Sequence, residues 1–172
     1  CRYCYAKVSA IRSRKRSASD WQVAEAVELR MRGSSSSPKI VMFPTQHDIT
    51  PEHLPACIDA IRQLLDMGSV EQVLIVSKPH LECIEAICSE FAAHKNRILF
   101  RFTIGSADDA VLSFWEPNAP SFKERLDCLK YAHEGGFRTS VSCEPMLDGD
   151  IDAVVSQVES LVSDAIWVGR GN

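Results

Sequence analysis

The stretch Gln72–Val76 reads QVLIV, with four aliphatic side chains in succession. A short run of this kind is typical of a strand buried on both faces of a sheet. Similar runs rich in β-branched and aromatic residues occur at Lys39–Phe43, Arg97–Phe102, Arg138–Val141 and Asp164–Val168. We therefore expect five short strands.

Amphipathic segments separate these runs. Apolar residues recur at three- and four-residue steps in four of them, between 54 and 65, 81 and 91, 122 and 129, and 151 and 162. Another helix is expected from about Asp20, followed by a loop at Gly33–Pro38. Alternating strands and helices imply a parallel α/β sheet, either doubly wound or part of a (β/α) barrel.

The composition is that of one soluble globular domain covering residues 1–172. Of the residues, 45% are hydrophobic and 24% charged, and no apolar run approaches the roughly 20 residues of a membrane span. We expect a cytoplasmic protein with no membrane partner. The seven cysteines are an odd number without framework spacing, which argues against a secreted disulfide scaffold.

The charge is distributed unevenly along the chain. The net charge is −4, yet six basic residues occupy the first sixteen positions: Arg2, Lys7, Arg12, Arg14, Lys15 and Arg16. Such a cluster can attract phosphates or a nucleic-acid backbone, and it can equally be a solvated basic surface.

Polar residues follow every expected strand. These strand ends are residues 44–48, 77–79, 103–106, 142–145 and 169–172. In parallel α/β folds, ligands bind at the carboxyl ends of the strands. We therefore expect a cavity lined by these groups.

Cys1 and Cys4 form a Cys-x-x-Cys pair within the stretch CRYCYA. A zinc site would need two further ligands with suitable spacing, and a thioredoxin-like pair would follow a strand. His47 and His53 could form a metal pair or could be exposed or capping residues. Four other cysteines are expected to be structural: Cys57, Cys83, Cys88 and Cys128.

The stretch CRYCYA resembles the second half of the radical S-adenosylmethionine motif, Cys-x-x-x-Cys-x-aromatic-Cys, with Tyr3 as the aromatic residue. Further similarities are Thr45, Asp48 and Pro51, Ser77–Pro79, Glu116–Ser121 with Glu124–Leu126, Gly135–Phe137 and Glu144–Leu147. Together they cover nearly the whole chain. The run from Glu116 to Leu126, continuing into Gly135–Phe137 and Glu144–Leu147, is similar to the spore photoproduct lyase-like branch and to related phage-type enzymes of unknown substrate.

The resemblance implies a partial (β/α)₆ TIM-like barrel whose first strand and first cluster cysteine are absent from this chain, with continuation expected after residue 172. Three thiolates would hold a [4Fe–4S] cluster, and S-adenosylmethionine would bind its open iron. The implied activity is generation of a 5′-deoxyadenosyl radical that abstracts hydrogen from an unknown substrate, with nucleic acid a candidate. An electron donor of the flavodoxin or ferredoxin type is implied as partner.

The resemblance also implies roles for individual residues. Cys1 and Cys4 would bind the cluster, Tyr3 would pack near the adenine, and the turn from Thr45 to Asp48 would meet the amino group. Lys78, Thr103, Ser106 and Arg125 are candidates for the carboxylate and ribose, and Glu144 is a further cofactor-binding candidate.

The stretch from Pro44 to Asp48 lacks the hydrogen-donor cysteine of the spore lyases. Cys143, at another strand end, is the candidate that could donate hydrogen instead. Two alternatives stay open. One is a barrel without a cluster that binds nucleic acid through its basic segment, and the other is an unrelated α/β enzyme with an accidental Cys-x-x-Cys pair.

Overall fold

The computed structural model describes residues 1–4, 8, 11–13, 39–45 and 47–170. All five expected strands are present within this part of the chain, with boundaries that shift by a few residues. They are β1 (Lys39–Phe43), β2 (Val70–Ser77), β3 (Ile98–Thr103), β4 (Arg138–Cys143) and β5 (Ile166–Val168). The expected helix from Asp20 and the loop at Gly33–Pro38 lie outside the described residues.

The four helices predicted from apolar periodicity are confirmed as α2 (Leu54–Asp66), α3 (Leu81–Glu90), α5 (Phe122–Glu134) and α6 (Ile151–Val158). Short 3₁₀ turns occur at η2 (Pro51–His53), η3 (Ala92–Arg97) and η4 (Glu159–Leu161). A further helix, α4 (Asp109–Trp115), was not predicted. Asp108 caps α4 by accepting a hydrogen bond from the Ala110 amide, and this cap was its main signal in the sequence.

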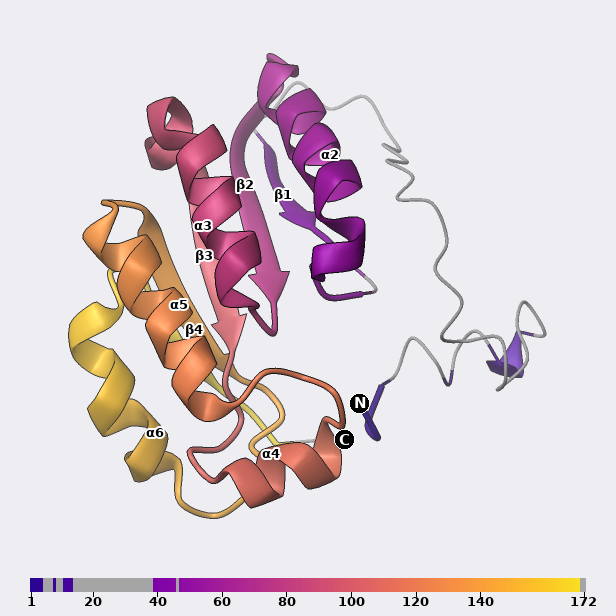
Figure 1. Cartoon of the computed structure of the whole chain (residues 1–172), viewed down its shortest axis with the longest axis vertical. Coiled ribbons are helices and arrows are strands. Elements are labelled where there is room, and N and C mark those ends of the chain that lie inside the picture. Colours follow the sequence, from indigo (N-terminus) through magenta and orange to yellow (C-terminus); the bar gives the residue numbers. More distant parts are fainter. Residues whose placement is uncertain (5–7, 9–10, 14–38, 46, 171–172) are drawn as a thin grey trace.

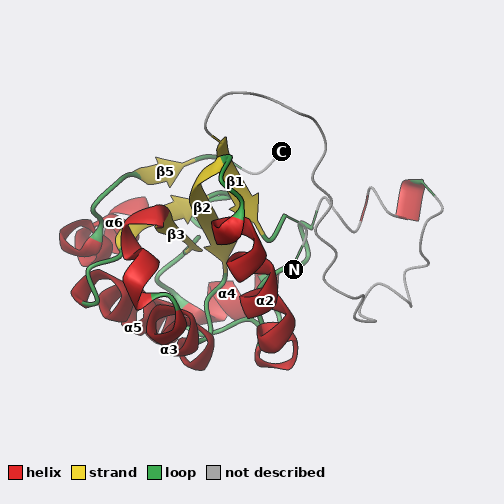
Figure 2. Ribbon diagram, turned by 90° about the horizontal axis from the view of Figure 1, so that it is seen from above, coloured by secondary structure: helices red, strands yellow, loops and turns green. Residues whose placement is uncertain are grey.

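The sheet is entirely parallel, and its strands follow the order β1-β2-β3-β4-β5. Figure 2 shows α2, α3, α5 and α6 together on one face of this sheet. A doubly wound sheet would reverse its strand order and carry helices on both faces. Over the described residues, the fold is therefore a singly wound parallel α/β sheet.

The core lies between the sheet and the four helices. Alternate strand residues such as Ile75, Phe100 and Val141 point toward the helices and are fully buried. On the opposite face, Ile40 and Met42 of β1 are 66% and 45% exposed. The two faces of the sheet therefore have different environments.

The carboxyl ends of the strands point toward the end of the molecule where α4 and the N-terminus lie (Figure 1). This edge is where the sequence analysis placed its candidate residues. Among the described residues, no helix combines the length and apolar character needed to cross a membrane.

Candidate functional site

The cysteine segment, Cys1–Cys4, docks onto the end of α4. The amide of Arg2 donates to the carbonyl oxygen of Trp115 at 2.7 Å, and the Arg2 guanidinium lies 4.2 Å from the centre of the Phe114 ring. The Tyr3 hydroxyl donates a hydrogen bond to Glu116. Cys1 is exposed and Cys4 is half-buried. These contacts hold the Cys-x-x-Cys pair at the carboxyl edge of the sheet.

Glu116 forms a buried ion pair with Arg125 of α5. Glu116 Oε2 and Arg125 Nη2 are 2.7 Å apart, and the side chains are 1% and 0% exposed. Arg125 also donates to two backbone carbonyl oxygens, from Nε to Pro120 at 2.9 Å and from Nη1 to Thr103 at 3.1 Å. Arg125 therefore links Glu116 to the backbone of Pro120 and Thr103 inside the protein, and it is not exposed to a ligand that arrives from solvent.

The environment of Tyr3 keeps its phenol protonated. Burial has the largest effect and raises its pKa, and the negative charge of Glu116 and the hydrogen bond to that carboxylate raise it further. The positive charge of Arg125 opposes these effects. Tyr3 is consequently a hydrogen-bond donor in the folded protein.

Asp48 and Lys78 connect the ends of β1 and β2. Asp48 Oδ1 accepts from the Lys78 amide at 2.8 Å, and Asp48 Oδ2 lies 3.3 Å from Lys78 Nζ. The Lys78 side chain is 13% exposed, whereas that of Asp48 is 36% exposed. Lys78 Nζ also lies 6.0 Å from the centre of the Tyr3 ring, at the outer limit of a cation–π contact. Thr45, on the same loop as Asp48, is exposed.

A pocket of about 100 Å³ opens between the cysteine segment and these strand ends. It is lined by Cys1, Asp48, Thr50, Lys78, His80, Glu116 and residues 117–120. This is room for several water molecules, well below the roughly 300–1,000 Å³ of a typical small-molecule pocket. The pocket suits a small polar group that carries both signs of charge, because the Asp48 carboxylate and the Lys78 cation line it together.

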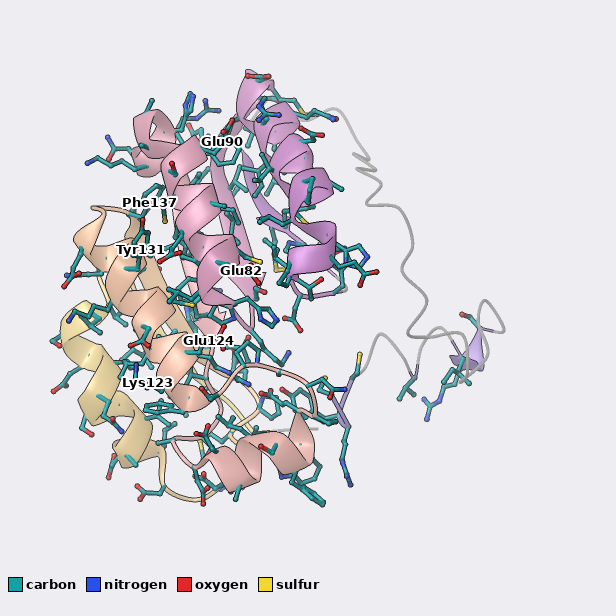
Figure 3. The ribbon with its side chains drawn as sticks, viewed as in Figure 1. Glu82, Glu90, Lys123, Glu124, Tyr131 and Phe137 are labelled. Carbon is teal, nitrogen blue, oxygen red and sulfur yellow. The ribbon has the colours of Figure 1, made fainter. Side chains whose placement is uncertain are left out.

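Glu124 and the histidines near the pocket contact residues of neighbouring segments. Glu124 of α5 accepts from the Leu81 amide at the start of α3, at 3.1 Å (Figure 3). Glu124 Oε1 also lies 3.8 Å from His80 Nδ1. His53 Nδ1 lies 2.9 Å from Thr50 Oγ1, and His47 is exposed. His53 thus makes a local contact at the start of α2, and His47 makes one in the loop before it, where its Nδ1 lies 3.1 Å from the Asp48 carbonyl oxygen.

The remaining candidates gather on the loops after β3 and β4. Ser106 is buried, donates to Asp148 and accepts from the Asp108 amide at 2.9 Å. Glu144 accepts from Ser142 Oγ at 3.0 Å, and Thr103 is buried. None of these three residues lines the pocket beside Cys1. The structure thus brings Cys1, Asp48 and Lys78 together and places Ser106 and Glu144 elsewhere.

Cys143 is fully buried in the hydrophobic core that includes Val141. Burial, with a contribution from Glu144, raises the pKa of its thiol to about 11. The expectation of a thiol facing the cavity differs from this packing, because strand alternation places Cys143 on the helix-covered face with Val141. Its role as a hydrogen donor stays a prediction that the packing does not favour.

The four cysteines expected to be structural are all buried: Cys57, Cys83, Cys88 and Cys128. Burial is the largest cause of a raised thiol pKa in each of them, to about 11 in Cys57 and to about 12 in Cys83 and Cys88. The prediction that Cys57 and Cys88 pack as small apolar residues is confirmed.

A [4Fe–4S] cluster requires thiolate ligands, and Cys1 and Cys4 supply two of the three that the resemblance implies. Within the described ranges, the cysteine segment included, no three His, Cys, Asp or Glu side chains form a metal-binding group. Cys1 and Cys4 can therefore supply two of the three thiolate ligands of the cluster.

The residues that the sequence analysis missed are Glu116, Thr50 and His80. Glu116 belongs to a stretch that carries the resemblance, but its partners are 113 residues before it and nine residues after it. The sequence offers no local signal for these pairings. Only the approach of α4 and α5 to the cysteine segment reveals them.

No protein-family model matches the chain, and no solved structure matches it. The chain is similar to the uncharacterized protein ORF301 of Acidianus two-tailed virus, with 24% identity over 108 residues. The similarity covers 63% of this chain and 35% of the viral protein, so it spans about a third of that relative's length. The name of the relative states no activity. The function must therefore be argued from the site.

Proposed function

We propose that residues 1–172 form the core domain of a radical S-adenosylmethionine enzyme in which Cys1 and Cys4 bind a [4Fe–4S] cluster. The observation that carries this proposal is the docking of Cys1–Cys4 at the carboxyl edge of a parallel sheet, through Tyr3 and the amide of Arg2. Catalytic groups of parallel (β/α) folds lie at this edge. The singly wound sheet is also the arrangement expected for part of a (β/α)₆ barrel wall.

The cluster and S-adenosylmethionine, when bound, would supply hydrogen-abstracting radical chemistry. This chain's part is to hold the two thiols and to bind the polar end of the cofactor. Lys78, Thr50 and His80 can donate hydrogen bonds to a carboxylate, and Asp48 can accept them from an ammonium group. Such a pairing matches an amino-acid group, which carries both charges and is small enough for the pocket.

The direct test of binding uses the full-length protein, reconstituted anaerobically with iron and sulfide. We expect iron and sulfide in a four-to-four ratio, with S-adenosylmethionine binding detected by calorimetry. Cys1→Ala and Cys4→Ala should lose the cluster, whereas Cys88→Ala, at a buried core position, should keep it.

A second pair of variants tests the pocket. Lys78→Ala should weaken S-adenosylmethionine binding, because it removes a cation from the pocket lining. Lys123→Ala is the matched control, since Lys123 is exposed on α5 and pairs only with Asp127 in the described structure. An equal loss of S-adenosylmethionine affinity in Lys78→Ala and Lys123→Ala would argue against this pocket as the binding site.

For the substrate we propose nucleic acid, supported by the exposed Arg2 within the cysteine segment and the exposed Arg12, which follows eight residues after Cys4. The proposed electron donor is a flavodoxin or ferredoxin. The same arginines favour the alternative of a nucleic-acid-binding module without a cluster. Iron-free protein that binds a labelled oligonucleotide with strong salt dependence, while reconstitution yields no cluster, would favour that alternative.

A further inference from the structure

We infer that Tyr3, Glu116 and Arg125 form a latch that positions the cysteine segment over the carboxyl end of β3. The latch gives Tyr3 and Arg125 positioning roles in place of the cofactor contacts that the resemblance implied. Its purpose rests on the proposed function, but its existence does not, because every contact is made between residues of this chain.

Glu116, which accepts the hydrogen bond from Tyr3, is held in place by the rest of the fold. Glu116 follows the last turn of α4, where its amide donates to the Leu112 carbonyl oxygen at 2.7 Å. Its carboxylate is fixed by Arg125, which in turn is held by the carbonyl oxygens of Thr103 and Pro120. A buried carboxylate held in one orientation therefore faces the cysteine segment.

The hydroxyl of Tyr3 supplies a hydrogen bond to Glu116 that a phenyl ring could not supply. A buried carboxylate that loses a hydrogen-bond donor is left partly unsatisfied, and this carries a free-energy cost. Phenylalanine at this position would fill the space but could not satisfy Glu116.

The latch acts on the cysteines through the backbone. Tyr3 lies between Cys1 and Cys4, and the neighbouring Arg2 amide is bonded to Trp115 at the same end of α4. Cys1 lines the pocket, whereas Tyr3 does not. Since Arg125 also bonds Thr103, the position of the two thiols is tied to the end of β3. Loss of the Tyr3 hydroxyl should therefore free the segment without disturbing the sheet.

The test measures amide hydrogen exchange and thiol alkylation in the reduced, metal-free protein. In Tyr3→Phe, we expect Arg2 amide exchange and Cys4 alkylation to be faster by about tenfold. The Leu112 amide, which bonds Asp108 within α4, and the buried Cys128 should keep their wild-type rates. Tyr131→Phe is the matched control, because Tyr131 is an exposed tyrosine on α5.

Wild-type rates for Arg2 and Cys4 in Tyr3→Phe would overturn the latch. If that variant fails to fold, the wild type alone decides, by comparison with a free peptide of residues 1–6. Slower Arg2 exchange in the protein than in the peptide supports docking, and equal rates overturn it. Because no iron is present, failure here is separate from failure of the cluster proposal.

Discussion

The carboxylate of Glu116 and the guanidinium of Arg125 meet 2.7 Å apart in the interior, with 1% and 0% of their side chains exposed. Breaking a buried pair leaves an uncompensated charge, which is more costly than losing an exposed pair. This pair also links the cysteine segment to the body of the fold through Tyr3. It is therefore central to both stability and the proposed site.

Replacing Arg125 with methionine should lower the free energy of unfolding by about 3–5 kcal/mol, because Glu116 would stay buried without its partner. The measurement is urea denaturation followed by circular dichroism. Arg62→Ala is the control, since the Arg62 pairs with Asp59 and Glu90 are exposed and should contribute little to stability. A loss in Arg125→Met no larger than in the control would contradict the buried pairing.

Alkaline pH should weaken docking of the cysteine segment. The pKa of Tyr3 is raised by burial and by Glu116, so the folded state holds this proton more tightly than the unfolded state. Its stabilising contribution is thus complete below about pH 10 and declines as the pH rises above that value. Absorbance at 295 nm during titration of wild type and Tyr3→Phe isolates this phenol. The prediction fails if the wild type shows one more phenolate than Tyr3→Phe at a pH where the cysteine segment is still docked and the protein is still folded.

Gly105→Ala should destabilise the loop after β3. A Cβ atom there would lie 2.7 Å from the Pro145 carbonyl oxygen and 2.8 Å from Leu147 Cγ, closer than such atoms can approach. We expect a loss of about 1–3 kcal/mol in the free energy of unfolding. Gly149→Ala is the control, because a Cβ atom there would meet nothing within 4 Å. Equal stability of the two variants would show that the loops after β3 and β4 are not packed as described.

Thiol labelling should separate the cysteines by position. At pH 8, a small alkylating reagent should modify Cys1 and Cys4 first, because neither is buried. Cys143 should stay unmodified until urea is added, since it is buried and its pKa is raised to about 11. Peptide mass spectrometry reads each site. Early labelling of Cys143 would contradict its place in the core.

Hydrophobic pattern was enough to predict the strands and the longer helices, because buried strands and amphipathic helices leave distinct periods in the sequence. It was not enough for α4, which has seven residues and mixes exposed Phe114 and Trp115 with buried Leu112. A helix this short shows too few turns for a period to be recognised.

The candidate site was predicted in part. Parallel strand order makes carboxyl-end residues neighbours, and this principle correctly joined Asp48 to Lys78. The resemblance made Arg125 a candidate for the cofactor carboxylate, because cations bind such groups, and in the structure Arg125 is paired with the buried Glu116. The alternation of Ser140, Val141, Ser142 and Cys143 could have placed Cys143 with Val141 on the core face.

The most direct test of the account is whether the full-length reconstituted protein forms 5′-deoxyadenosine when given S-adenosylmethionine and a strong reductant. Chromatography should show the product in wild type and in Cys88→Ala, and none in Cys1→Ala or Cys4→Ala. Product that persists without Cys1 and Cys4, or a complete absence of product from a wild type carrying a full cluster, would contradict the proposed radical chemistry.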